Sequence, residues 1–217
     1  MKLAVLISGS GSNLQAFLDQ VGSGELSAEI AVVLSNKADA YGLVRATKAG
    51  IPTEVVDHRA YSQREDFDRA LLDALAPYAV DLVILAGFKR ILTPVFISTF
   101  SGRLLNIHPS LLPRYPGLHT HQRAIDAGDQ WGGATVHFVT EELDGGPPVI
   151  QAKVPIHPGD NADKLAARVL EREHIIYPLA AQWFAQGRLL LGERGAELDG
   201  ELLPETGYSY QQPAAAD

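Results

Sequence analysis

The chain has 217 residues, no cysteine and a formal net charge of −8 at pH 7. The lack of cysteine excludes disulfides, thiolate metal ligands and a cysteine nucleophile, and the acidic balance argues against a broad nucleic-acid surface, which needs clustered Lys and Arg. No apolar run is long enough to cross a bilayer, and the opening residues are too glycine-rich for a signal peptide. We therefore expect a soluble cytoplasmic protein that acts on small molecules, without nucleic acid or membrane, as a monomer or homodimer.

Strand and helix patterns alternate through the first half of the chain. Near-continuous apolar segments, typical of strands buried on both faces, occur at 2–7, 29–35 and 80–87, with a shorter one at 53–57. Helical patterns begin near Asn13, Ala40 and Ser62, and Ser62 followed by Glu65 predicts a capping box. This alternation predicts a parallel sheet with right-handed crossovers.

The second half begins with a short helix at 94–100 and a strand at 102–110, and continues through a turn-rich segment at 111–125 that becomes helical. Strand-like segments at 133–139 and 149–156 predict a hairpin that extends the sheet in a mixed, antiparallel direction. A long helix follows from Asn161, and Pro178 either kinks it or starts its second part. We expect one Rossmann-like α/β domain over 1–207, a mostly parallel sheet flanked by helices, and a loose tail at 208–217.

The segment "LISGSGSNLQAF" at 6–17 reads as a strand, a tight turn and a helix start, with Ser12 or Asn13 as the predicted N-cap. Such a turn directs backbone N–H groups at one point, and Gly9 and Gly11 allow a ligand to approach closely. A phosphate or carboxylate fits this arrangement. The alternative interpretation, a tight turn that binds no ligand, also remains.

Two nucleotide motifs compete for the same segment. A dinucleotide loop needs a third glycine where Leu14 stands, and an acidic residue at the end of the next strand, where the chain has Ser35 and Asn36. A nucleoside-triphosphate loop needs a Gly-Lys-Ser/Thr ending, which does not follow Gly11. The first match is poor and the second is excluded.

Asn106, His108 and Asp144 are the residues best suited to chemistry. Asn106 and His108 are two residues apart and point the same way on a strand, which Pro109 ends. Asp144 lies in "ELDGGPP", a turn that can hold a carboxylate above such a strand end. An amide donor, an acid–base histidine and an orienting carboxylate suit acyl transfer. From the residues alone, a purely structural role remains equally open.

Three further histidines are ambiguous. His119 and His121 in "HTH" invite a metal site, but no HExxH motif or suitably spaced acid supplies the other ligands, so a helix start is favoured and no metal is expected. His137 either faces the same sheet edge or is buried and hydrogen-bonded, and the sequence does not choose.

The segments "NIHPSLLPRYPGLHT" and "LDGGPPVIQAKVPI", with "LISGSGSNL", "SNKADAYGLVRA" and "LAGFKRIL", closely resemble the folate-dependent phosphoribosylglycinamide formyltransferases of purine synthesis. The resemblance extends to about Gly207. "HPSLLP" is shared by enzymes that use 10-formyltetrahydrofolate, and "SGSGSNL" points to the glycinamide family. It implies a formyltransferase fold in which 1–100 form the half that binds the ribotide phosphate and 101–207 the catalytic and folate-binding half.

The resemblance also implies residue roles. Asn106, His108 and Asp144 match the family's catalytic set. The positions that match ribotide contacts are Gly11, Ser12, Asn13 and Glu173. The positions that match folate contacts are Arg64, Lys89, Arg90, Ile91, Leu92, Asn106, Thr140, Glu141, Glu142, Leu143 and Asp144. This sequence departs from the family at Lys89, where methionine is more usual, so a side-chain packing role there does not carry over.

The activity so implied is direct formyl transfer from 10-formyltetrahydrofolate to the amine of N1-(5-phospho-D-ribosyl)glycinamide, in IMP biosynthesis, with His108 as general acid and no metal. The alternative is a 10-formyltetrahydrofolate hydrolase, whose family resembles this one but carries an extra N-terminal regulatory domain. Methionyl-tRNA formyltransferase is longer and has a tRNA-binding domain, which the acidic charge disfavours. A nicotinamide oxidoreductase would explain the sheet but not the missing third glycine.

Overall fold

The computed structural model describes residues 1–212. The strands of the main sheet are β1 (Lys2–Ile7), β2 (Glu29–Ser35), β3 (Thr53–Val55), β4 (Leu82–Leu85), β5 (Leu104–His108), β6 (Trp131–Phe138), β7 (Pro148–Pro155) and β11 (Tyr208–Ser209). The helices are α1 (Ser12–Ser23), α2 (Tyr41–Lys48), α3 (Arg64–Leu75), α4 (Pro94–Thr99), α5 (Thr120–Asp126) and α6 (Ala162–Ala185), with short 3-10 turns η1 (His58–Ala60) and η2 (Ala76–Tyr78). A second, small sheet contains β8 (Leu189–Gly192), β9 (Gly195–Leu198) and β10 (Glu201–Leu202).

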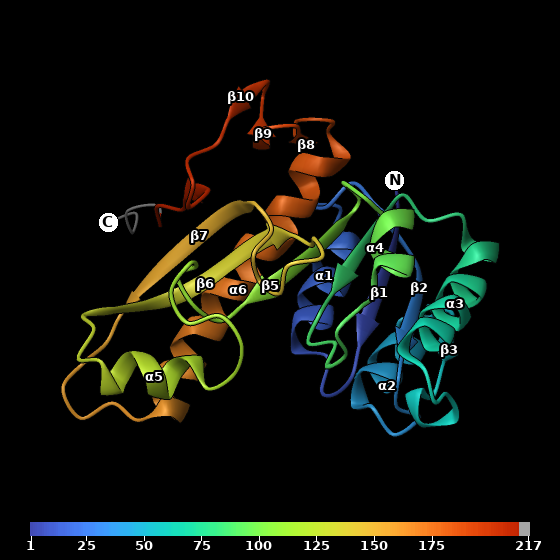
Figure 1. Cartoon of the computed structure of the whole chain (residues 1–217), viewed down its shortest axis with the longest axis horizontal. Helices are drawn as coiled ribbons and strands as arrows, with labels where there is room; N and C mark the ends of the chain where they lie inside the picture. The colour runs from blue at the N-terminus through green and yellow to red at the C-terminus, as the bar shows by residue number, and fades with distance from the viewer. Residues whose placement is uncertain (213–217) are drawn as a thin grey trace.

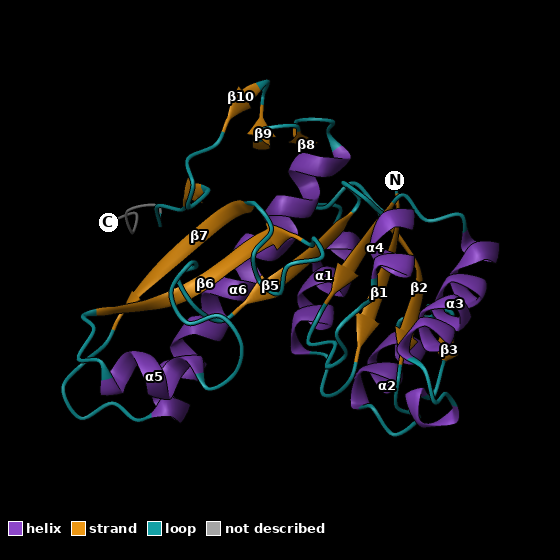
Figure 2. Cartoon of the chain, viewed as in Figure 1, coloured by secondary structure: helices purple, strands orange, loops and turns teal. Residues whose placement is uncertain are grey.

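The main sheet has the strand order β11-β7-β6-β5-β4-β1-β2-β3 (Figure 1). Strands β3, β2, β1, β4 and β5 are parallel, whereas β6 is antiparallel to both β5 and β7. Figure 2 shows the parallel strands β1 to β3 on the right and the β6–β7 hairpin on the left, with α5 near the end of the hairpin opposite its turn. The predicted α/β fold, mostly parallel with an antiparallel extension, is confirmed.

Two apolar cores lie on opposite faces of the sheet, which explains why the strands read as continuous apolar runs. In β1, the side chains of Leu3, Val5 and Ile7 pack with α1 and α6, while Ala4 and Leu6 pack with α3 and α4. Alternate residues of a strand face opposite sides, so a strand covered on both faces needs apolar residues at every position. Because these buried strands run parallel, their carboxyl ends lie at one edge of the sheet.

Helix α6 is tied to the centre of the sheet by Tyr177, which is fully buried. Its hydroxyl lies 2.8 Å from the Leu85 carbonyl oxygen and 2.9 Å from the Leu105 carbonyl oxygen, and its ring meets Phe17 of α1 edge-on at 5.2 Å. A buried hydroxyl needs such a partner. This contact holds α6 against α1 and so positions Glu173, one turn earlier. Pro178 lies inside α6, which is a single helix of 24 residues.

The predicted helix starts need two corrections. Helix α1 begins after Gly11, whose φ of 73° is left-handed, and it has no side-chain cap. The Asn13 side chain bonds Glu173 instead, so neither Ser12 nor Asn13 is the N-cap. Helix α3 follows Gln63, also without a side-chain cap, so the capping box at Ser62 does not form.

The C-terminal segment carries more structure than the sequence indicated. Residues 189–202 form the antiparallel sheet β8–β9–β10, which was not predicted. Strand β11 pairs in parallel with β7, so the predicted loose tail at 208–217 is wrong for its first residues. Gly207 has a φ of 77°, and a Cβ there would lie 2.7 Å from the Val149 carbonyl carbon, so the missing side chain allows this close approach. Residues 213–217 lie outside the described residues.

Candidate active site

The predicted catalytic residues lie near the edge where the parallel strands end. Strand β5 ends at His108, and its neighbour β4 pairs Leu85 with Asn106. The turn after β1 and the loop after β4 leave the sheet at the same edge, where ligands of open parallel sheets bind. On the other side of β5, antiparallel β6 places His137 opposite Asn106.

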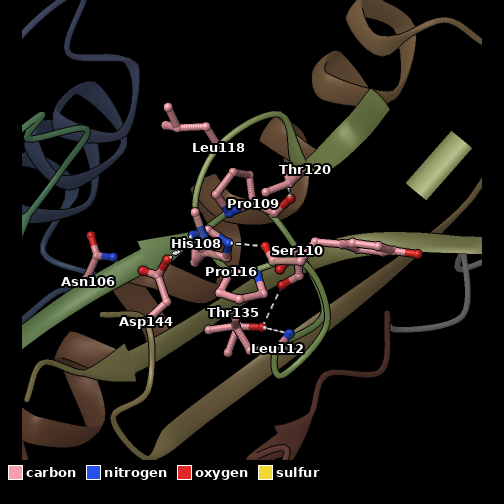
Figure 3. A network of polar contacts seen from close by, with 12 residues as sticks. Asn106, His108, Pro109, Ser110, Leu112, Pro116, Leu118, Thr120, Thr135 and Asp144 are labelled. Atoms are coloured by element: carbon pink, nitrogen blue, oxygen red, sulfur yellow. Dashed lines mark hydrogen bonds and ion pairs between the residues drawn. The ribbon is translucent and has the colours of Figure 1, made fainter. Parts of the chain in front are cut away.

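His108 is buried, and both of its ring nitrogens have partners (Figure 3). Nε2 lies 2.8 Å from the carbonyl oxygen of Tyr115, so it carries a proton and donates it to that oxygen. Nδ1 lies 3.5 Å from Oδ2 of Asp144, and the Gly117 backbone N–H donates to the same Oδ2 at 2.8 Å. The ring is therefore held between the loop after β5 and the turn that carries Asp144.

Asn106 is oriented by His137, whose role the sequence left open. Burial lowers the pKa of His137, and the hydrogen bond to the Phe138 carbonyl and the Asp144 charge offset this only in part, so the ring is neutral near neutral pH. Nδ1–H donates to the Phe138 oxygen at 3.0 Å, which leaves Nε2 to accept from Nδ2 of Asn106 at 3.1 Å. One Nδ2 hydrogen remains directed elsewhere. The 3.9 Å approach of His137 to Asp144 is consequently not an ion pair.

The loop at 109–119 is fastened to the sheet by hydroxyl groups. The Thr135 hydroxyl on β6 donates to the Ser110 carbonyl at 2.7 Å and accepts from the Leu112 N–H at 3.1 Å. The Thr120 hydroxyl donates to the Pro109 carbonyl at 2.7 Å. Figure 3 shows this network next to His108. These bonds satisfy buried backbone groups and fix the course of the loop.

Tyr115 is the centre of a second set of contacts in the same loop. Its hydroxyl donates to Oδ2 of Asp129 at 2.7 Å, and the guanidinium groups of Arg114 and Arg123 lie 5.1 and 5.2 Å from its ring centroid. Arg123 also donates to the Pro116 carbonyl at 2.6 Å. The φ of Tyr115 is 54°, a left-handed value that a residue with a side chain rarely adopts unless its surroundings hold it. No local sequence signal pointed to this cluster.

The turn after β1 is a close-packed backbone loop. A Cβ on Gly11 would lie 2.7 Å from the Gly42 Cα at the start of α2, and the Gly42 N–H donates to the Gly9 carbonyl at 3.0 Å. Arg45 of α2 donates to the Ser10 carbonyl at 2.8 Å. The turn is thus fixed from outside and leaves the first N–H groups of α1 available to an anion.

Asn13 and Glu173 meet beside this turn. Nδ2 of Asn13 donates to Oε2 of Glu173 at 2.9 Å, and Oδ1 of Asn13 is buried without a hydrogen-bond partner among residues 1–212. Burial raises the pKa of Glu173, and the Asn13 bond and the nearby charge of Lys89 counter this only in part. A buried carboxyl and an unpartnered amide oxygen side by side are suited to bind hydroxyl or amine groups of a ligand.

The positions matched to folate contacts lie on four separate segments, one of which is β5 with Asn106. The loop 86–93 after β4 carries Lys89, whose backbone N–H donates to Ser8 Oγ at 2.8 Å, and the turn 139–147 between β6 and β7 carries Thr140 to Asp144. Arg64 stands in the first turn of α3 and makes no side-chain hydrogen bond within the described residues. Ile91 and Leu143 are exposed and Leu92 is buried. Only Asn106 and Asp144 of this set lie in the His108 cluster.

Two other features lie outside this edge. A cavity of about 410 Å³ behind the loop 109–115 is lined by α5, β6 and β7 and by His121, and it contains none of the predicted site residues. His119 is the N-cap residue of α5. Within residues 1–212 no group of three or more His, Asp or Glu side chains is placed to hold a metal ion, and no helix is both long and apolar enough to cross a membrane.

An amide, a histidine and a carboxylate that meet at the carboxyl edge of a mostly parallel sheet are suited to acyl transfer. The family model described as formyl transferase matches residues 1–181, so the chain belongs to that family. It is 54% identical over 212 residues to the phosphoribosylglycinamide formyltransferase of Escherichia coli strain K12, which covers 98% of this chain and 100% of that protein.

Two further relatives agree. The chain is 46% identical over 194 residues to the human trifunctional purine biosynthetic protein adenosine-3, covering 89% of this chain and 19% of that protein. The structure of the phosphoribosylglycinamide formyltransferase of Coxiella burnetii, in complex with CHES, superposes with a TM-score of 0.93 at 46% identity, covering 97% of this chain and 99% of that one.

Proposed function

We propose that this chain transfers the formyl group of 10-formyltetrahydrofolate to the amine of N1-(5-phospho-D-ribosyl)glycinamide, giving formylglycinamide ribonucleotide and tetrahydrofolate in purine biosynthesis. The main support for the proposal is the cluster of Asn106, His108 and Asp144, at the same sheet edge as the glycine turn between β1 and α1. Similarity over the full length of enzymes named for this reaction supports it.

The chemistry follows from the cluster. The neutral amine attacks the formyl carbon, and negative charge develops on the formyl oxygen as the tetrahedral intermediate forms. The free Nδ2 hydrogen of Asn106 and the Nδ1–H of a protonated His108, which lies 3.5 Å from Asp144 while Nε2 stays bonded to Tyr115, are suited to donate to that oxygen. Loss of one such donor costs about 10²–10³ in rate. As the C–N10 bond breaks, the leaving nitrogen takes a proton and the former amine loses one. Asp144 orients the His108 ring during this exchange.

The two substrates divide the edge of the sheet between them in this proposal. The ribotide phosphate sits on the backbone amides of Gly11, Ser12 and Asn13, and Glu173 contacts the ribotide. The folate lies against Arg64, the segment 89–92 and the segment 140–144. Residues 1–100 then supply the phosphate cradle and 101–207 the catalytic groups. Glu173 bonds Asn13 and Arg64 lies in the first half, so each substrate site draws on both halves.

An activity assay with both substrates tests the function. Purified protein is mixed with the ribotide and 10-formyltetrahydrofolate, and release of tetrahydrofolate is followed with and without ribotide. We expect release only when ribotide is present. Release without ribotide would mean a hydrolase, an alternative that the relatives do not favour. His108→Ala and Asp144→Asn should lose most turnover and keep ribotide binding, whereas normal turnover in either would contradict the assigned roles.

We further propose that the enzyme works in the cytoplasm on small molecules alone, without nucleic acid or membrane, as a monomer or homodimer. The net charge of −8 supports the lack of a nucleic-acid partner. Light scattering on the purified protein distinguishes the two oligomeric states.

A further inference from the structure

Asp68 is a buried carboxylate that the proposed chemistry does not use. It lies in the middle of α3, and its residue is 0% exposed. Its Oδ2 accepts two hydrogen bonds from Thr93, one from the backbone N–H at 2.6 Å and one from the hydroxyl at 2.7 Å. Its Oδ1 is buried and has no hydrogen-bond partner among the described residues. A half-satisfied buried carboxylate is costly, so its presence calls for a reason other than stability.

Thr93 connects this carboxylate to the loop after β4. Thr93 is the N-cap residue of α4 and is 1% exposed, and its hydroxyl does not cap α4 but donates to Asp68. The loop 86–93 is therefore held at two points, by Ser8 at the Lys89 N–H and by Asp68 at Thr93. The residues matched to folate contacts, Lys89 to Leu92, lie at or between these two points. Asp68 thus fixes one end of that segment.

A positively charged residue, Arg64, precedes this carboxylate by about one helical turn. Arg64 is four residues earlier in α3, and residues four apart lie on the same side of a helix. Burial raises the pKa of Asp68, and the two Thr93 hydrogen bonds and the Arg64 charge counter this only in part. Arg64 has no side-chain hydrogen bond of its own within residues 1–212.

We propose that Asp68 is a positioning residue that holds the two folate-contacting elements of the first half, Arg64 and the segment 89–92, in one arrangement. This inference rests on the proposed function, because it takes those elements to contact folate. Asp68 touches neither substrate. It acts through Thr93 on one element and through its charge on the other.

Two substitutions separate these routes. Asp68→Asn keeps an oxygen that can accept both Thr93 bonds but removes the charge that attracts Arg64. Thr93→Val keeps the backbone N–H but removes the hydroxyl, while Thr93→Ser keeps both donors. Asp66→Asn is the matched control, because Asp66 is exposed on the same helix and its one ion pair among residues 1–212 is with Arg69.

The test measures kcat and both KM values for each folded variant. We expect the KM for 10-formyltetrahydrofolate to rise about fivefold or more in Asp68→Asn and in Thr93→Val, with the ribotide KM within about twofold of wild type. Thr93→Ser and Asp66→Asn should behave as wild type. In Arg64→Ala, adding Asp68→Asn should raise the folate KM less than it does in wild type, because the partner of the charge is gone.

The outcomes are distinguishable. An unchanged folate KM in Asp68→Asn or Thr93→Val, or an equal rise in both KM values, would overturn the inference. If Asp68→Asn does not fold, Thr93→Val decides alone. If the wild-type protein shows no folate-dependent formyl transfer, the proposed function fails instead, and the inference about folate positioning fails with it.

Discussion

The imidazole Nε2 of His108 donates to the backbone carbonyl of Tyr115 at 2.8 Å, and the Tyr115 side chain is held in turn by Asp129. The left-handed backbone of Tyr115 therefore fixes the orientation of His108 from a loop seven residues away. With Nε2 bound to the loop, Nδ1 is left facing Asp144.

Tyr115→Phe should lower kcat with little effect on either KM. The substitution removes the hydroxyl bond to Asp129 but keeps the carbonyl that meets His108, so the loop loosens without losing its contact. A hydrogen bond is worth about 1 kcal/mol, which corresponds to about fivefold in rate. Steady-state kinetics measure the loss, and the 15N chemical shift of His108 Nε2 reports whether its hydrogen bond weakens.

Tyr78→Phe is the matched control for this variant. It removes an equivalent 2.7 Å hydrogen bond, from Tyr78 to Glu54, at a place distant in the sequence from the loop. We expect its kcat to equal that of wild type. An equal loss of kcat in both variants, or an unaltered 15N shift in Tyr115→Phe, would count against the positioning role of Tyr115.

Sequence reasoning reached the parts of the site that depend on local patterns. Asn106 and His108 share a strand face because strand side chains alternate, and Asp144 stands in a Gly-Pro turn. It could not reach Tyr115, because the contact of its carbonyl with His108 depends on the course of a loop. It could not decide His137 either, since the pairing of His137 with Asn106 comes from the register between two strands that are distant in sequence.

In the fold too, the elements with a local sequence pattern were predicted and those that depend on distant contacts were not. Buried strands and amphipathic helices were predicted because both faces of the sheet are covered, which leaves a strong apolar pattern. The start of α1 was missed because a left-handed Gly11 replaces a side-chain cap. Strand β11 has two residues and exists only because β7 offers an edge, so its sequence carries no strand pattern of its own.

Gly11→Ala should destabilise the protein and weaken ribotide binding, whereas Gly9→Ala should leave the fold intact. A Cβ on Gly11 would lie 2.7 Å from the Gly42 Cα, and the φ of 73° at Gly11 is left-handed, which alanine rarely adopts. A Cβ on Gly9 would have no described atom within 4 Å. Such backbone strain costs about 1–3 kcal/mol. Urea unfolding measures the difference in stability and titration calorimetry the ribotide affinity. Equal stability of the two variants would refute the packing argument.

Lys89→Met should weaken ribotide binding in a salt-dependent manner. The Lys89 backbone N–H donates to Ser8, which lies at the start of the glycine turn after β1. Burial raises the pKa of Glu173, and the charge of the Lys89 side chain counters this in part. A cation beside this turn attracts a phosphate, and salt screens such an attraction. We expect the ribotide KM to rise by about twofold to fivefold at low ionic strength and to approach the wild-type value in about 0.5 M salt.

Lys153→Met is the control for this charge effect, because Lys153 lies on β7 beside the cavity behind the loop 109–115. Its ribotide KM should stay at the wild-type value at every salt concentration. A salt-independent change in the ribotide KM of Lys89→Met would contradict this electrostatic explanation.

Glu173→Gln should stabilise the fold and weaken ribotide binding. Burial raises the pKa of Glu173 above its ordinary value of 4.5, so ionised Glu173 costs the folded protein free energy that glutamine avoids. Below pH 4.5 the carboxyl is protonated in both the folded and unfolded states and no cost arises. As pH rises from there through the raised folded pKa, the unfolded chain loses the proton first, and wild-type stability falls. The stability gain of Glu173→Gln should therefore grow over this window and then stay constant.

Urea unfolding at several pH values from about 5 to about 8 measures this gain as a difference in unfolding free energy. Glu171→Gln, on the exposed side of α6, is the matched control and should show no such trend. The ribotide KM of Glu173→Gln should rise because the carboxylate paired with Asn13 is lost. A stability difference that is the same at every pH, or a less stable variant at pH 8, would show that the buried charge is compensated in the folded protein.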